Sequence, residues 1–166
     1  MLVALVAPPA RAHFGERTDS LWGFVSRSDV IVIGRVADSR SHEKMGHTTQ
    51  PGAARLVVDE MLLGAAGPEL AILVEGMHQP RYAPGEHVLV FAERSRGILR
   101  SLQSRAEKVT IGAAVDPVVE AVRRYARIAA LESSRVRTAA LEDLTIALLS
   151  SPVVRLHQDA VFDLSR

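Results

Sequence analysis

A chain of 166 residues, 48% hydrophobic and 23% charged, is long enough for one folded domain with an appendage and too apolar to be disordered. Its 20 basic and 19 acidic side chains leave a net charge of +1, which excludes a global field that would attract nucleic acid or an anionic membrane. There is no cysteine, so disulfides, thiolate metal sites and cysteine nucleophiles are also excluded.

The first residues have the pattern of the end of a secretory signal peptide. Residues 2–7 form a short apolar run, two prolines follow, and Ala10-Arg11-Ala12 has the small-x-small form of a cleavage site. A basic n-region is missing, so we expect the natural start to lie upstream. We predict an exported protein, periplasmic or extracellular, cut after Ala12; a frayed apolar N-terminus is the alternative. No run is long enough to predict a membrane span.

Residues 19–27 are predicted to form a short helix, capped by Asp19 and anchored on the barrel by Trp22. The run DVIVIGRVA that follows is the clearest strand, and Gly34 within it indicates a bulge or a close backbone contact. A polar loop is expected over residues 38–52. Further strands are predicted over residues 53–63, 70–75, 86–92, 97–102 and 108–111. Six short strands separated by turns predict a small antiparallel barrel or sandwich.

The pattern then becomes helical. Asp116 is a capping residue and Pro117 suits the first helical position. Val122 and Tyr125 follow at helical spacing, so we expect this helix to pack against the barrel. Two further helices are predicted, one over residues 136–149 and one from a Ser151-Pro152 cap toward Leu164.

Three stretches resemble a known type of barrel: SDVIVIGRV at residues 28–36, MLLG at 61–64 and YAPGEHVLVF at 82–91. They are similar to exported bacterial proteins with an OB-like barrel of the netrin/tissue-inhibitor-of-metalloproteinase type. The resemblance spans about residues 20–112 and implies an α+β fold, a small antiparallel OB-like β-barrel with a C-terminal helical segment. Inhibitors of this type reach the protease zinc with an N-terminal, disulfide-anchored cysteine. This chain has none, so that route of inhibition is not implied.

The helical segment carries a second resemblance. The stretch SPVVR at residues 151–155, followed by Ala160 and Leu164, is similar to one helix of a HEAT-type repeat. The expected organisation is a truncated signal peptide over residues 1–12, an OB-like barrel domain over 13–112 and an incomplete helical segment over 113–166.

The histidines are the candidate metal ligands. After the predicted cleavage, His13 becomes the first residue, and its amino group and imidazole form a chelate suited to Cu(II). His47, His78 or His87 would complete a three-nitrogen site, as in copper-dependent polysaccharide oxygenases. The alternative is an accidental histidine after the cleavage site, with His42 and His47 solvated in the loop. We therefore predict no metal and no cofactor, and keep copper binding by His13 as an alternative.

No sequence signature of catalysis is present. The nucleophile elbow GxSxG, the zinc motif HExxH, a P-loop and a dinucleotide fingerprint are all missing. Asp59-Glu60 and Glu142-Asp143 are adjacent carboxylates, and neighbours in a strand or helix point to different faces, so we do not expect them to share a substrate. We predict that the protein is not an enzyme and has no catalytic residues.

A basic stretch over residues 94–108 is the best indication of a binding surface. Its members are Arg94, Arg96, Arg100, Arg105 and Lys108, opposed only by Glu107. On a barrel rim these side chains could hold a polyanion, but the stretch has no aromatic residue to stack on a base, so nucleic acid is disfavoured. The alternative is a solvated hairpin that prevents edge pairing with other chains.

Fold analogy favours an exported, non-enzymatic binding or interaction module, with another protein as its partner. The barrel would be the recognition element and the helices a support or a second contact surface. Two alternatives stay open: a regulator or inhibitor of an extracellular hydrolase, acting through loops near residues 38–52 or 78–85, and a copper-binding protein or enzyme that uses His13.

The export prediction is tested by expressing the full upstream gene in a bacterial host. We expect a periplasmic product that begins at His13, identified by intact mass and N-terminal sequencing. A cytoplasmic product that retains Met1 would contradict both export and the copper site at His13.

Overall fold

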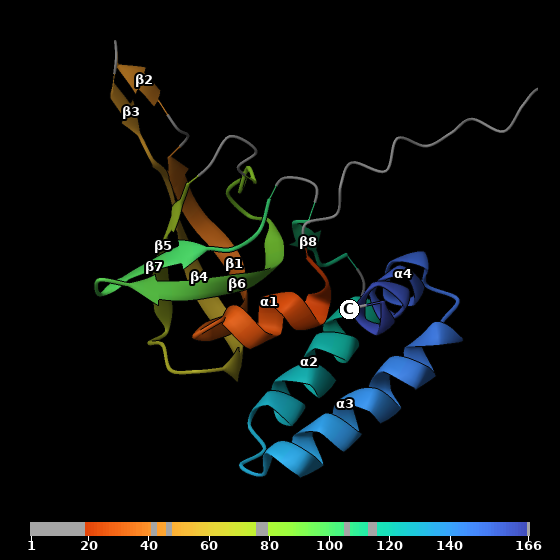
Figure 1. Ribbon diagram of the computed structural model, residues 1–166. Coiled ribbons are helices and arrows are strands. Elements are labelled where there is room, and N and C mark those ends of the chain that lie inside the picture. Colours follow the sequence, from red (N-terminus) through yellow and green to blue (C-terminus); the bar gives the residue numbers. More distant parts are fainter. Residues whose placement is uncertain are drawn as a thin grey trace, which may run out of the picture.

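The computed structural model describes residues 19–40, 43–45, 48–75, 80–104, 107–112 and 116–165 (Figure 1). Its helices are α1 (Leu21–Arg27), α2 (Pro117–Ala129), α3 (Ser134–Leu149) and α4 (Val154–Leu164). Its strands are β1 (Val30–Arg40), β2 (Glu43–Met45), β3 (Thr48–Gln50), β4 (Gly52–Leu63), β5 (Glu69–Val74), β6 (His87–Ser95), β7 (Ile98–Ser101) and β8 (Val109–Thr110). Within these ranges, no helix has both the length and the apolar character that crossing a membrane requires.

Five strands close into a barrel in the order β1-β4-β5-β7-β6, and β6 pairs back onto β1. Neighbouring strands are antiparallel except β5 and β7, which run parallel. This is the five-stranded arrangement of an OB-like barrel. The short strand β8 adds to β6, and helices α2, α3 and α4 follow the barrel in the chain. The predicted α+β class and OB-like barrel are therefore confirmed.

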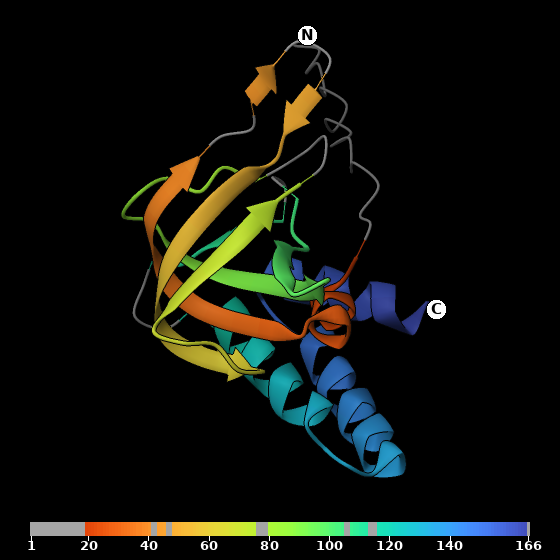
Figure 2. The same ribbon diagram turned by 90° about the vertical axis from the view of Figure 1, so that its left-hand side faces the viewer.

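The polar segment after β1 is more ordered than expected. β1 continues to Arg40, and β2 pairs with β3 along its whole length, so a two-stranded ribbon projects beyond the barrel (Figures 1 and 2). The prediction of a loop over residues 38–52 was wrong. Ladder hydrogen bonds come from the backbone, so a hairpin can continue through side chains that carry no hydrophobic signal.

The barrel interior is filled from alternate positions of its strands. On β1 and β6 the inward side chains are Val30, Val32, Val88 and Val90, each at most 1% exposed. They pack against buried side chains of the other strands and of the segment before β6, including Leu56, Leu70, Ile72, Val74, Tyr82 and Leu99. Successive side chains of a strand point to opposite faces, so the residues between these valines must point outward.

Those outward residues are also buried. Ile31, Ile33, Leu89 and Phe91 are between 0% and 4% exposed and belong to a second core, shared with all four helices. From α2 this core receives Val122 and Tyr125, so the predicted packing of that helix against the barrel is confirmed. β1 and β6 are therefore buried on both faces, which explains their nearly unbroken apolar runs.

Helix α1 lies between the barrel and the other helices (Figure 1). The ring of Phe24 packs on Phe91 of β6 with centroids 5.3 Å apart, and Trp22 packs on Tyr125 of α2 at 5.8 Å. Trp22 is also packed against the second core, to which the barrel contributes, so both aromatic residues of α1 take part in anchoring it. α1 joins the two layers of the molecule.

Two helix caps also differ from the prediction. Ser20 caps α1, with its side chain accepting a backbone N–H, while Asp19 forms an ion pair with Arg27. α4 is capped by Val153 without a side-chain bond, and the Ser151 hydroxyl instead accepts the N–H of Val153 at 3.2 Å. For these two helices the predicted capping residue lies one or two positions too early, whereas Asp116 caps α2 as predicted.

Gly34 lies where β1 and β4 approach each other closely. A Cβ atom at this position would lie 2.5 Å from the backbone oxygen of Val57. The pairing register of β1 with β4 also shifts between Ile33 and Gly34. The predicted bulge or close backbone contact at Gly34 is confirmed, and both features occur together.

We expect Gly34→Ala to lower the free energy of unfolding by about 2–3 kcal/mol, because backbone atoms of β4 must move to admit the methyl group. Gly67→Ala is the matched control: its nearest atom would lie at 3.8 Å, so its effect should stay within about 0.5 kcal/mol. Urea unfolding followed by circular dichroism measures both. Equal effects for the two variants would contradict the close approach of β1 and β4.

Candidate functional site

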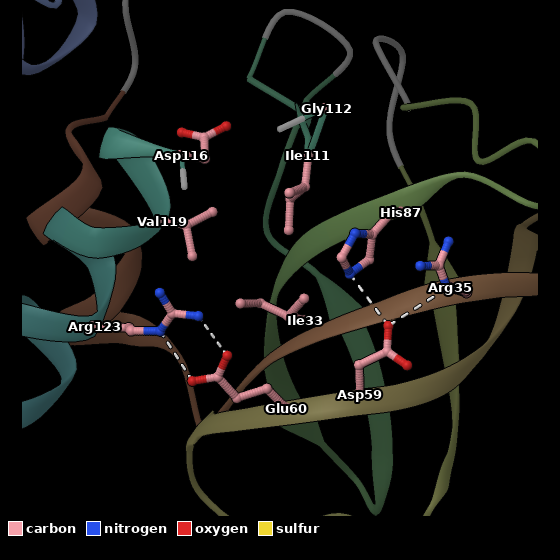
Figure 3. Close-up of a pocket in the computed structure, with 10 residues that line it drawn as sticks. All are labelled: Ile33, Arg35, Asp59, Glu60, His87, Ile111, Gly112, Asp116, Val119 and Arg123. Atoms are coloured by element: carbon pink, nitrogen blue, oxygen red, sulfur yellow. Dashed lines mark hydrogen bonds and ion pairs between the residues drawn. The ribbon is translucent and has the colours of Figure 1, made fainter. Parts of the chain in front are cut away.

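A cavity of about 450 Å³ lies at the junction of the barrel and α2, within the size range of ligand pockets (Figure 3). We call it the junction pocket. Its walls come from β1, β4, β6, the segment after β8 and the first turns of α2. The lining residues are Ile33, Arg35, Asp59, Glu60, His87, Ile111, Gly112, Asp116, Val119 and Arg123.

Asp59 and Glu60 both line this pocket although they are neighbours on β4. In the ladder with β1, Glu60 pairs with Ile33 and Val58 pairs with Gly34, so Asp59 is left as an extra residue. A bulge of this kind interrupts the alternation of side chains. The expectation that these two neighbouring side chains point to different faces was therefore wrong. Gly34 on the opposite strand was the sequence signal that could have revealed it.

Glu60 is held by Arg123 of α2 in a two-bond ion pair. Arg123 Nε donates to Oε1 at 2.9 Å and Nη2 donates to Oε2 at 2.5 Å. The hydrogen bonds from Arg123 hold the pKa of Glu60 below its usual value, against the opposing effect of burial. Glu120 of the same helix lies 3.4 Å from Arg123 and is a second acidic partner of its guanidinium group. This pair joins the barrel to the helical layer at the edge of the pocket.

His87 and Arg35 face Asp59 on the barrel side. The two residues lie opposite each other in the pairing of β1 with β6. His87 Nε2 lies 3.2 Å from Asp59 Oδ2, and Arg35 Nε lies 3.8 Å from the same oxygen (Figure 3). The contact of His87 is not a hydrogen bond, since its buried Nε2 has no such partner in the described part of the chain. Two side chains therefore lie near the carboxylate of Asp59, but neither forms a hydrogen bond with it.

The lining residues limit the chemistry of the pocket. They include no serine, threonine, cysteine or lysine, so the groups there that could act as nucleophiles are carboxylates and His87. His87 beside Asp59 can move a proton, which by itself defines no reaction. Among the residues that the structure describes, no three histidines or carboxylates are arranged to hold a metal ion.

The structure separates the predicted basic surface into parts. Lys108 lies just before β8, near the start of β6, whereas Arg94 and Arg96 lie at the other end of β6 and in the turn after it. The residues of β6 between its start and Arg94 span about 20 Å. Arg100 on β7 pairs with Glu75 at 3.1 Å. Arg105 lies outside the described residues.

Lys108 is largely sequestered. Its ammonium group donates to both oxygens of Glu86, at 2.8 and 2.7 Å, and to the backbone oxygen of Arg81 at 2.5 Å. Burial alone raises the pKa of Glu86, but the bonds from Lys108 and from the Ala83 N–H outweigh it and the pKa is lowered. The same ammonium lies 5.7 Å from the centroid of the Tyr82 ring. Burial of Tyr82 raises the pKa of its hydroxyl to about 12. The ammonium group of Lys108 is therefore engaged within the barrel and is poorly placed to bind a polyanion.

The structure describes only some of the candidate metal ligands. His13, His42, His47 and His78 lie outside the described residues. His87 lies in the junction pocket. His157 on α4 contacts the backbone oxygen of Leu149 through Nδ1 at 2.7 Å.

The outer sides of β4, β5 and β7 form the part of the barrel away from the second core, and we call them the open face. Its members are Ala53, Arg55, Val57, Glu69, Ala71, Leu73, Ile98 and Arg100. Val57 is 42% exposed and Ile98 is 47% exposed, and Arg55 pairs with Glu69 at 3.2 Å. Apolar and small side chains thus alternate with paired charges, and no aromatic residue occurs on these three strands.

The fold and these two surfaces define a class of protein: an OB-like barrel covered on one side by helices, with a mixed polar and apolar open face. No protein-family model matches the chain, and no curated protein is significantly similar to it. The class is therefore defined by architecture.

The ion pair across the pocket has a pH-dependent effect on stability. The folded-state pKa of Glu60 lies below its unfolded value, so the pair stabilises the fold above the unfolded pKa, and this is lost as the pH falls through the folded pKa. We expect Arg123→Gln to cost about 0.5–1 kcal/mol at neutral pH, a value reduced because both side chains are partly exposed, and to cost little in acid.

Urea unfolding at neutral pH and at about pH 3 measures this difference. Arg124→Gln, on the exposed side of the same helix, is the control and should change stability by less than about 0.5 kcal/mol at both pH values. A cost of Arg123→Gln that does not depend on pH would contradict the role given to Glu60.

Proposed function

We propose that this protein is an exported, non-enzymatic binding module that recognises another protein through the open face of its barrel. The observation that carries the proposal is the chemistry of that face, where exposed Val57 and Ile98 stand among paired charges. Protein interfaces combine apolar contacts with hydrogen-bonding groups in this way.

The arrangement of the layers supports the choice of face. The helices cover the outer sides of β1 and β6, so the outer sides of β4, β5 and β7 are what the barrel offers to a partner (Figure 2). OB-like barrels use the same region to bind ligands. Oligonucleotides and oligosaccharides are held there by stacking on aromatic rings, which these strands lack, so a protein is the favoured partner.

The resemblance to barrels of the netrin/tissue-inhibitor-of-metalloproteinase type is part of the proposal, because such barrels are protein-binding. A secreted or periplasmic hydrolase is one partner class that this reading includes. The absence of cysteine means that a hydrolase would be bound without a cysteine at its metal. Copper binding at His13 stays an alternative prediction, because His13 lies outside the described residues.

Site-specific photocrosslinking in the producing cell tests the proposal. A photoreactive phenylalanine at position 57 should give an adduct with one defined protein, whereas the same group at position 124 on the exposed side of α2 should not. Ala71→Lys places a charged stem on the open face, and we expect it to weaken binding of the purified partner about tenfold or more.

Two results would count against the proposal. Equal adducts at positions 57 and 124 would mean that the open face is not the contact surface. An adduct with nucleic acid or polysaccharide in place of a protein would mean that the partner class is wrong.

A further inference from the structure

The charges of the junction pocket do not balance. Three carboxylates, of Asp59, Glu60 and Asp116, face the guanidinium groups of Arg35 and Arg123, so the lining carries a charge of −1 with His87 counted as neutral. Arg123 is engaged by two carboxylates, Glu60 on the barrel and Glu120 on its own helix. The pocket therefore has little capacity for an anion.

The carboxylates of the pocket can accept further hydrogen bonds from a ligand. No hydrogen bond of the described residues ends on the carboxylate of Asp59, whose side chain is 41% exposed. Asp116 accepts the N–H of Val118 through Oδ1 at 2.8 Å as the cap of α2, and its second oxygen accepts nothing from the described residues. An ionised carboxylate can accept several hydrogen bonds, so the described residues use only part of the capacity of either group.

Between these carboxylates the pocket is apolar. Ile33, Ile111 and Val119 lie between the Asp59 side and the Asp116 side (Figure 3). A surface with a hydrophobic floor and carboxylates at its margins fits a group that has an alkyl stem and a cationic head. Arginine and lysine side chains have this form.

The pocket is continuous with the open face along β4. Val57 lies two residues before Asp59 on the same strand, about 6–7 Å away, and is exposed on the outer side. A partner that covers Val57 is therefore within one side-chain length of the pocket.

We propose that the junction pocket takes an arginine or lysine side chain of the protein partner, with its charged head at Asp59 and its stem on the apolar floor between Asp59 and Asp116. The source of that side chain rests on the proposed function, whereas the chemistry of the pocket does not. The interaction is a partly exposed, charge-assisted one, so an isolated probe should bind with a dissociation constant of about 1–10 mM.

The test is an NMR titration of the full chain with N-acetyl-arginine methylamide as the probe. The neutral isostere N-acetyl-citrulline methylamide and the anionic N-acetyl-glutamate methylamide are the comparison ligands. We expect saturable shifts at His87 and Gly112 with the arginine probe and much smaller shifts with the other two. Equal binding of citrulline, preferred binding of glutamate, or no saturable shift with arginine would each overturn the proposal.

Variants place the interaction. Asp59→Asn keeps the size of the side chain and should weaken the arginine probe about threefold to tenfold. Asp143→Asn, an exposed aspartate on α3, is the matched control and should leave the affinity unchanged. If Asp59→Asn has no larger effect than Asp143→Asn, the pocket is not the site.

This test and the crosslinking test fail separately. Loss of probe binding with an intact adduct at position 57 would remove the pocket from recognition and leave the protein-binding proposal in place. Probe binding that depends on Asp59, without any adduct at position 57, would retain the cation-binding pocket and remove the open face.

Discussion

The pairing of β1 with β6 is the interaction on which the rest of the structure depends. One side of the pair fills the barrel through its valines, and the other side supplies Ile31, Ile33, Leu89 and Phe91 to the core beneath the helices. Full burial of such a side chain contributes about 1.5–3 kcal/mol, so the outer side alone accounts for several kcal/mol of stability. Because the same two strands serve both cores, their position determines where the helices lie.

The junction pocket follows from this arrangement and from one irregularity. Beyond Ile33 the outer side of β1 becomes polar at Arg35, so α2 no longer covers it and a cavity opens. At the same level the bulge in β4 turns Asp59 outward beside Glu60. Glu60 then joins the helical layer through Arg123, and Asp59 remains available at the surface. A single extra residue thus separates a carboxylate with a structural role from one that can meet a ligand.

Sequence reasoning predicted the parts of the fold that depend on local pattern. The β-branched runs located the barrel strands, and Asp116-Pro117 located the start of α2. It failed where the cause was not local. The β2–β3 ribbon depends on pairing through polar residues, and the contact of Phe24 with Phe91 joins residues 67 positions apart. The pocket was missed for the same reason, since its residues come from five segments and the bulge that brings Asp59 into it is a property of two strands.

The two-sided burial of β1 and β6 also bears on how this architecture can change over time. A barrel without its helices would expose four large apolar side chains in one patch, a surface prone to aggregation. We therefore expect the barrel and the helices to be retained together in evolution, although they occupy successive parts of the chain. Sequence drift and inserted segments are tolerated best where neither core is involved, and the ribbon of β2 and β3, which projects away from both, is such a place (Figure 2).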